Sequence, residues 1–78
     1  MSIYSELLKL VASALHRSID ELSMDIPFEE QGIDSIDLVE ILLKVEDRYG
    51  IYVPDSDVVE LRNLSQLAAW LDEHIHRE

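Results

Sequence analysis

The 78-residue sequence contains no cysteine, two glycines, two prolines and six basic residues. Without cysteine, the chain forms no disulfide framework and has no thiol of its own for covalent chemistry. Because glycine and proline are scarce, no flexible linker or low-complexity segment is present, and we interpret residues 1–78 as a single domain. No apolar run approaches the roughly 18 residues of a membrane-spanning helix, and no signal peptide is recognisable. A cytoplasmic protein without a membrane span is therefore expected.

The six lysines and arginines face 17 aspartates and glutamates, which gives a formal net charge of −11. This charge repels nucleic acid and anionic membranes, and it favours partners that carry basic patches. A chain of this length closes only a modest core, so a deep enzyme cleft is not expected. No histidine lies near the middle of the sequence to activate a nucleophile there. We therefore predict a protein that is not an enzyme and has no catalytic residues.

Hydrophobic periodicity predicts four helices. Apolar residues recur at helical spacing in residues 3–16, in residues 35–49 and from Leu64 to Ile75. A short helix is predicted at residues 56–61, and a single helical turn at residues 19–22 within a long loop. Gly50 and then Pro54 end the second long helix. The predicted fold is all-α, a small four-helix bundle with a long first loop and a short third helix.

An angular count at about 100° per residue divides the helix at residues 35–49 into two faces. The predicted core face comprises Leu38, Ile41, Leu42, Val45 and Tyr49. Ile36, Val39 and Leu43 fall on the opposite side, among acidic residues. Either this helix is buried on two sides, or these apolar residues form an exposed docking surface. Small bundles rarely enclose a helix completely, which favours the docking surface.

The segment GIDSI at residues 32–36 stands at the start of the same helix. Asp34 is the better N-cap, because Asp37 lies three residues later and can close a capping box, whereas Leu38 could not do so for Ser35. Ser35 is then left at the first helical position with an exposed hydroxyl. A plain capping serine remains the alternative interpretation, since serine is common at helix starts.

The remaining polar and aromatic features have structural interpretations. His74 and His76 are two apart on a helix and point about 200° away from each other, so no metal site is predicted. Trp70 is expected to pack beside the core. The acidic cluster at residues 55–57 is expected to cap the short helix.

The segment GIDSID at residues 32–37 is followed by YGI at residues 49–51 and VPD at residues 53–55. Together with the length and the acidic balance, these residues resemble the acyl carrier proteins of dissociated fatty acid and polyketide synthases. The resemblance covers nearly the whole chain. It implies a phosphopantetheine arm that a separate phosphopantetheinyl transferase attaches covalently to Ser35. It also implies that partner enzymes read a surface formed by Ile36, Asp37, Val39, Glu40, Leu43, Glu46 and Asp47.

The implied function is that of a monomeric phosphoprotein of lipid metabolism. It would hold acyl intermediates as thioesters and deliver them to acyl-transferring and ketosynthase-type enzymes with basic patches. Two alternatives remain open: a carrier of an activated amino acid, either D-alanyl or peptidyl, and an acidic adaptor that is never modified. The aspartate before Ser35 argues against the peptidyl version.

The sequence also departs from the family pattern. Ile36 stands where leucine is usual, a change that keeps an apolar side chain. Gln31 stands where an apolar residue is common, and we expect it to loosen the loop. Lys44 and Arg48 add positive charge to a helix that is often more uniformly acidic, which predicts a different partner specificity.

Overall fold

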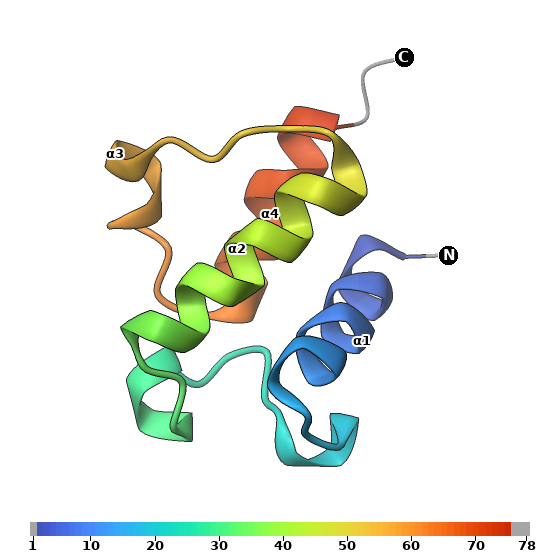
Figure 1. Cartoon of the computed structure of the whole chain (residues 1–78), viewed down its shortest axis with the longest axis vertical. Helices are drawn as coiled ribbons and strands as arrows, with labels where there is room; N and C mark the ends of the chain where they lie inside the picture. The colour runs from blue at the N-terminus through green and yellow to red at the C-terminus, as the bar shows by residue number, and fades with distance from the viewer. Residues whose placement is uncertain (1, 76–78) are drawn as a thin grey trace.

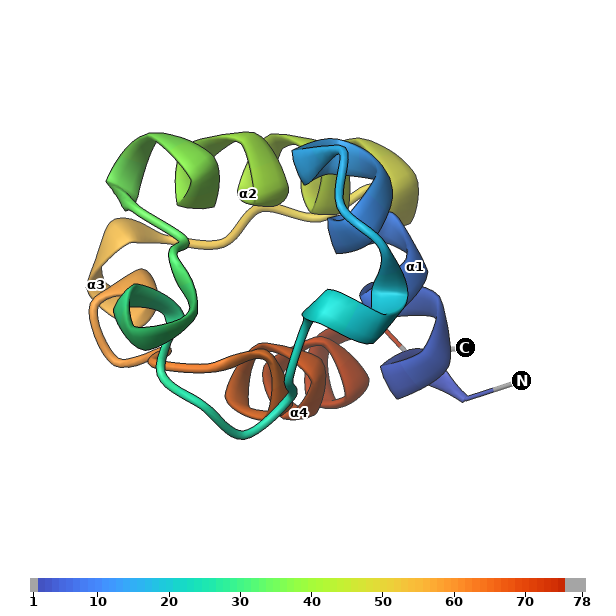
Figure 2. The same cartoon turned by 90° about the horizontal axis from the view of Figure 1, so that it is seen from below.

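The computed structural model describes residues 2–75, and within them the chain forms helices and no strand. The elements in order are α1 (Ile3–Leu15), η1 (Ile19–Glu21), η2 (Phe28–Gln31), α2 (Ser35–Tyr49), α3 (Asp55–Val58) and α4 (Leu64–Ile75). Figure 1 shows α2 crossing the molecule in front of α4, with α1 beside them. Seen from below, α1, α2 and α4 surround a common centre, and α3 and η2 close one side (Figure 2). The predicted all-α four-helix bundle is confirmed.

The core is built from the apolar faces that helical periodicity predicted. Its buried members are Leu7 and Val11 of α1, Ile41 and Val45 of α2, Leu64, Leu67, Ala68 and Leu71 of α4, and Phe28 and Ile33 of the first loop. The two loop residues help to set the position of Ser35, because they anchor the chain just before α2. Phe28 donates its backbone N–H to the carbonyl of Arg62 (2.9 Å), and Ile33 donates to the carbonyl of Phe28 (2.9 Å). The backbone segment that leads to Ser35 is thus anchored to the core.

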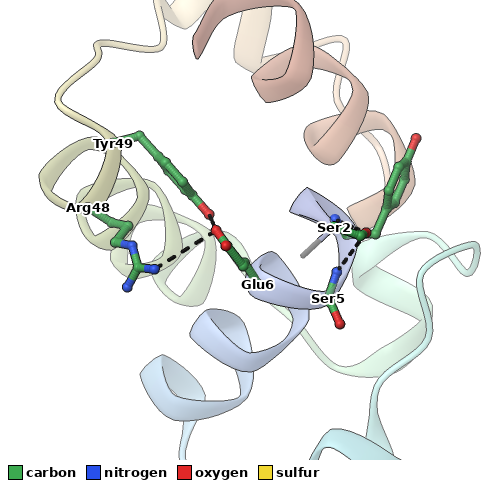
Figure 3. A network of polar contacts seen from close by, with 6 residues as sticks. Ser2, Ser5, Glu6, Arg48 and Tyr49 are labelled. Carbon is green, nitrogen blue, oxygen red and sulfur yellow. Dashed lines mark hydrogen bonds and ion pairs between the residues drawn. The ribbon is translucent and has the colours of Figure 1, made fainter. Parts of the chain in front are cut away.

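A polar network joins α1 to the C-terminal end of α2 (Figure 3). The Tyr49 hydroxyl donates to Glu6 Oε1 (3.1 Å), and Arg48 Nη2 lies 3.9 Å from the same oxygen. Burial raises the pKa of Tyr49, and its hydrogen bond to Glu6 and the charge of Glu6 raise it further. In the same view, Ser2 caps α1 by accepting from the backbone N–H of Ser5. The contacts of Glu6 with Arg48 and Tyr49 join α1 to the end of α2 that lies away from Ser35.

Gln31 fastens the first loop, so the expectation that it loosens the loop is wrong. Its side-chain amide donates to the carbonyls of Ser23 and Ile26, each at 2.9 Å. Its Oε1 accepts from the backbone N–H of Ser23 at 2.9 Å. An apolar side chain at this position could make none of these three bonds. The sequence pattern showed the departure from the family but not the backbone groups that the amide reaches.

We expect Gln31→Leu to destabilise the protein by about 1 to 3 kcal/mol, because three hydrogen bonds of ordinary strength are lost. A domain of this size would then lose roughly 4 °C or more in its melting temperature. Urea unfolding followed by circular dichroism measures the change. Glu30→Gln is the control, because Glu30 is an exposed neighbour, and it should stay within about 0.5 kcal/mol of the parent. Equal stability of Gln31→Leu and the parent would contradict the role assigned to Gln31.

Arg17 holds the last residues of this loop. Its Nη1 donates to the carbonyl of Gln31 (2.8 Å), and its Nη2 donates to the carbonyl of Gly32 (2.7 Å). Gly32 has φ of +78°, in the left-handed region where other residues are strained. The turn therefore requires glycine, and the Arg17 guanidinium fixes the backbone immediately before Asp34 and Ser35.

The short helix differs from its predicted form. α3 begins at Asp55 and ends at Val58, and tight turns then continue to Leu61, which donates to the carbonyl of Val58 (3.0 Å). The predicted capping by the acidic cluster is wrong, because Pro54 is the N-cap and makes no side-chain cap bond. Asp57 instead accepts from Nε1 of Trp70 (2.9 Å). Trp70 is partly buried against the core, as predicted, and this bond ties α3 to α4.

Candidate functional site

Ser35 occupies the first position of α2 and does not cap the helix. Asp34 is the N-cap: its Oδ1 accepts from the N–H of Asp37 (2.8 Å), and Asp37 Oδ2 accepts from the N–H of Asp34 (3.3 Å). Both carboxylates lie at the positive end of the helix dipole. The Ser35 side chain is exposed, and its hydroxyl makes no hydrogen bond to any residue among 2–75. The capping box predicted from spacing is confirmed, and the serine hydroxyl is left available.

Two grooves meet at Ser35. We call the first the arginine groove; it has a volume of about 440 Å³ and is lined by Phe28, Glu29, Ile33, Asp34, Ser35, Leu38, Val58, Val59, Leu61 and Arg62. We call the second the tyrosine groove; it has a volume of about 380 Å³ and is lined by Ser35, Leu38, Val39, Leu42, Leu43, Glu46, Tyr52, Val53, Asp55 and Val58. Both volumes fall in the range of about 300 to 1,000 Å³ typical of ligand sites. A group attached to Ser35 could therefore lie along either largely apolar groove.

The outer face of α2 is an exposed apolar surface with an acidic margin. Ile36 is 72% exposed, Val39 55% and Leu43 61%, so the alternative of a helix buried on two sides is wrong. Glu40 and Asp47 are exposed beside them. We call these five residues the acidic–apolar surface. Monomeric proteins seldom expose several large apolar side chains together unless the patch is a binding surface.

The other two residues predicted for partner binding also have structural roles. Asp37 completes the capping box, and it is only partly exposed. Glu46 accepts from the backbone N–H of Val53 (3.0 Å), which holds the segment after α2 against the helix. Lys44 lies among the acidic residues, sharing a shallow depression with Glu40 and Asp47. Lys44 therefore places an exposed positive charge beside these acidic residues.

Ser35 has no histidine beside it in either groove. His16 ends α1, and His74 stacks on Trp70 with ring centroids 3.8 Å apart, while His76 lies outside the described residues. Among residues 2–75, no group of three or more histidines and carboxylates is placed to hold a metal ion. In the same residues, no helix has the length and apolar character needed to span a membrane.

Comparison with known proteins decides what this arrangement is. The family described as "Phosphopantetheine attachment site" matches residues 5–71, which include α1 through most of α4. The chain belongs to the acyl carrier protein family. A protein named acyl carrier protein from Rickettsia bellii (strain OSU 85-389) is 30% identical over 74 residues, covering 94% of this chain and 91% of the relative.

Other acyl carrier proteins match at similar levels. One from Rhodococcus erythropolis (strain PR4 / NBRC 100887) is 33% identical over 72 residues, covering 91% of this chain and 79% of the relative. One from Clostridium perfringens (strain 13 / Type A) is 25% identical over 76 residues, covering 96% of this chain and all of the relative. The resemblance inferred from GIDSID and the later turns is therefore confirmed, as is phosphopantetheine as the cofactor of the family. Carriers of this family are generally not enzymes.

Sequence reasoning missed several residues that surround the serine of this acyl carrier. Tyr52 and Val59 are exposed, and each lines a groove at Ser35. For Tyr52, an aromatic residue in the loop before Pro54 was a usable signal. Arg62 also lines the arginine groove, and its position depends on how the loop after α3 folds back.

The crowded carboxylates predict a salt-dependent stability. With a net charge of −11, the folded chain repels itself at low ionic strength, where the Debye length is about 30 Å at 0.01 M. Raising NaCl to about 0.15 M shortens this length to about 8 Å and should raise the melting temperature. Millimolar magnesium or calcium should also raise it, because divalent cations reduce the repulsion between carboxylates. A melting temperature indifferent to both salts would contradict this picture.

Proposed function

We propose that this chain carries acyl groups as thioesters on a phosphopantetheine arm attached to Ser35 and delivers them to enzymes of fatty acid or polyketide biosynthesis. The observation that carries the proposal is the Ser35 hydroxyl, which is exposed and unbonded among residues 2–75, at the junction of two grooves. When attached, the arm supplies the thiol that this cysteine-free chain lacks.

The residues around Ser35 fit such a group. Capping by Asp34 and Asp37 leaves the serine oxygen free to attack phosphorus, so coenzyme A would lose its nucleotide half as the phosphodiester to Ser35 forms. The described residues that line the two grooves include no histidine, and we propose that the hydroxyl proton passes to a base on a phosphopantetheinyl transferase. Arg17 and Gly32 hold the preceding turn in place, which fixes the backbone just before Ser35.

The acidic–apolar surface is our candidate for the contact with partner enzymes, together with Asp37 and Glu46 at its edges. Exposed Val39 and Leu43 supply apolar contact area, and the flanking carboxylates attract the basic patches of acyl-transferring and ketosynthase-type enzymes. Such charge complementarity speeds encounter more than it tightens the complex, so the carrier can leave after each step. We propose that the carrier is a cytoplasmic monomer.

Incubation of the chain with coenzyme A and a broad-specificity phosphopantetheinyl transferase tests the proposal. Intact mass should rise by one phosphopantetheine group, and the product should gain one thiol that reacts with a thiol reagent. Absence of any mass gain would contradict the carrier function and favour an unmodified adaptor. Loading the product with malonyl or acetyl groups, but not with D-alanine, by the respective transfer enzymes separates the acyl carrier from an amino-acyl carrier.

A further inference from the structure

Of the three arginines within residues 2–75, Arg62 is the one whose side chain forms no hydrogen bond or ion pair there. Arg17 donates to two backbone carbonyls, and Arg48 lies beside Glu6 and over the ring of Tyr49. In contrast, the guanidinium of Arg62 forms no hydrogen bond or ion pair within residues 2–75, although the chain carries 17 carboxylates. In so acidic a chain, an unpaired guanidinium in a groove is available to bind an anion that the chain itself does not supply.

The backbone of Arg62 is nevertheless fixed at the groove. Its N–H donates to Oε1 of Gln66 (2.6 Å), and its carbonyl accepts from the N–H of Phe28 (2.9 Å). One bond reaches α4 and the other reaches η2. The exposed side chain can therefore move, but it starts from a fixed point on the wall of the arginine groove, which Ser35 also lines.

The charges in the two grooves differ. The tyrosine groove contains Glu46 and Asp55 and no basic residue, whereas the arginine groove contains Arg62 as well as Glu29 and Asp34. A phosphodiester on Ser35 would add a permanent negative charge next to carboxylates that already repel it. Arg62 is the one basic residue among the described residues that line either groove, and guanidinium groups pair well with phosphate oxygens.

We propose that Arg62 pairs with the phosphodiester of the phosphopantetheine arm and biases the arm toward the arginine groove. This inference rests on the proposed attachment to Ser35. The alternative anion is the terminal carboxylate of a malonyl-type acyl group. We choose the phosphodiester because it is fixed to Ser35 in the same groove, whereas the acyl group is attached at the far end of the arm. Arg62 thus acts as a positioning residue for the arm.

The test compares the unmodified chain, the thiol-bearing loaded form and the malonyl form by NMR, after intact mass has verified each state. The Arg62 Nε–H resonance should shift when the arm is attached, and its hydrogen exchange should slow about two- to fivefold, as expected for an exposed ion pair. Roughly 0.5 M NaCl should reverse both changes. The ³¹P resonance of the loaded form should differ between the parent and Arg62→Gln but not between the parent and Arg48→Gln, which removes the same charge elsewhere.

Each outcome decides the proposal. An Arg62 resonance that moves only in the malonyl form would assign the anion to the acyl carboxylate and overturn the phosphodiester contact. Loading without any change at Arg62, or an equal ³¹P change in Arg48→Gln, would overturn the inference while leaving the carrier function intact. Failure of the parent chain to gain mass would overturn both.

Discussion

Ser35→Ala is expected to gain no phosphopantetheine, while its fold and stability stay close to those of the parent. The loss should be complete, because we propose the Ser35 hydroxyl as the single attachment point of the arm. The stability should change by less than about 0.5 kcal/mol, because the Ser35 hydroxyl makes no hydrogen bond to the described residues. Intact mass after incubation with coenzyme A and a transferase measures the loading, and urea unfolding measures the stability.

Ser56→Ala is the matched control for this experiment. Ser56 is also an exposed serine near the start of a helix, at the second position of α3. This variant should load as the parent does. If Ser35→Ala still gained the phosphopantetheine mass, or if Ser56→Ala lost it, the assignment to Ser35 would be wrong.

We also expect Leu43→Lys to lower the efficiency of partner enzymes by about five- to fiftyfold. The substitution removes an apolar side chain that is 61% exposed, and it places a positive charge where a basic partner patch would approach. Most of the loss should appear in KM, because the hydroxyl that reacts is unchanged. The measurement is kcat/KM for loading by a phosphopantetheinyl transferase, with the parent chain and the variant at several salt concentrations.

Two controls separate the causes of this loss. Leu43→Gln removes the apolar contact without adding charge, and it should give an intermediate loss that depends less on salt. Ala69→Lys adds the same charge at an exposed position of α4, and it should load as the parent does. An equal loss in Leu43→Lys and Ala69→Lys would show that net charge alone matters, and the acidic–apolar surface would then have no special role.

The helices and the geometry around Ser35 could be predicted because local rules determine them. Helical periodicity placed the core faces, and the spacing of Asp34 and Asp37 gave the capping box that leaves Ser35 free. The angular count likewise placed Val39 and Leu43 on an exposed face, because one helix cannot bury both sides in so small a bundle.

The parts that could not be predicted depend on contacts between distant segments. Gln31 and Arg17 act on backbone groups of the loop, and no local pattern shows which carbonyls will lie within reach. Asp57 bonds to Trp70 across 13 positions instead of capping α3. Arg62 comes to the groove of Ser35 through the fold of the loop after α3. Such long-range polar contacts appear only once the helices are packed.

The most direct test of the central claim is the intact mass of the chain purified from its own cells, before and after neutral hydroxylamine, which cleaves thioesters. We predict a mass that exceeds that of the 9.0 kDa chain by one phosphopantetheine group and one acyl group. After proteolytic digestion, both groups should lie on the fragment that contains Ser35. Hydroxylamine should remove the acyl group and leave the arm. A native protein whose mass is that of the unmodified chain, or whose arm lies on a fragment without Ser35, would contradict the account.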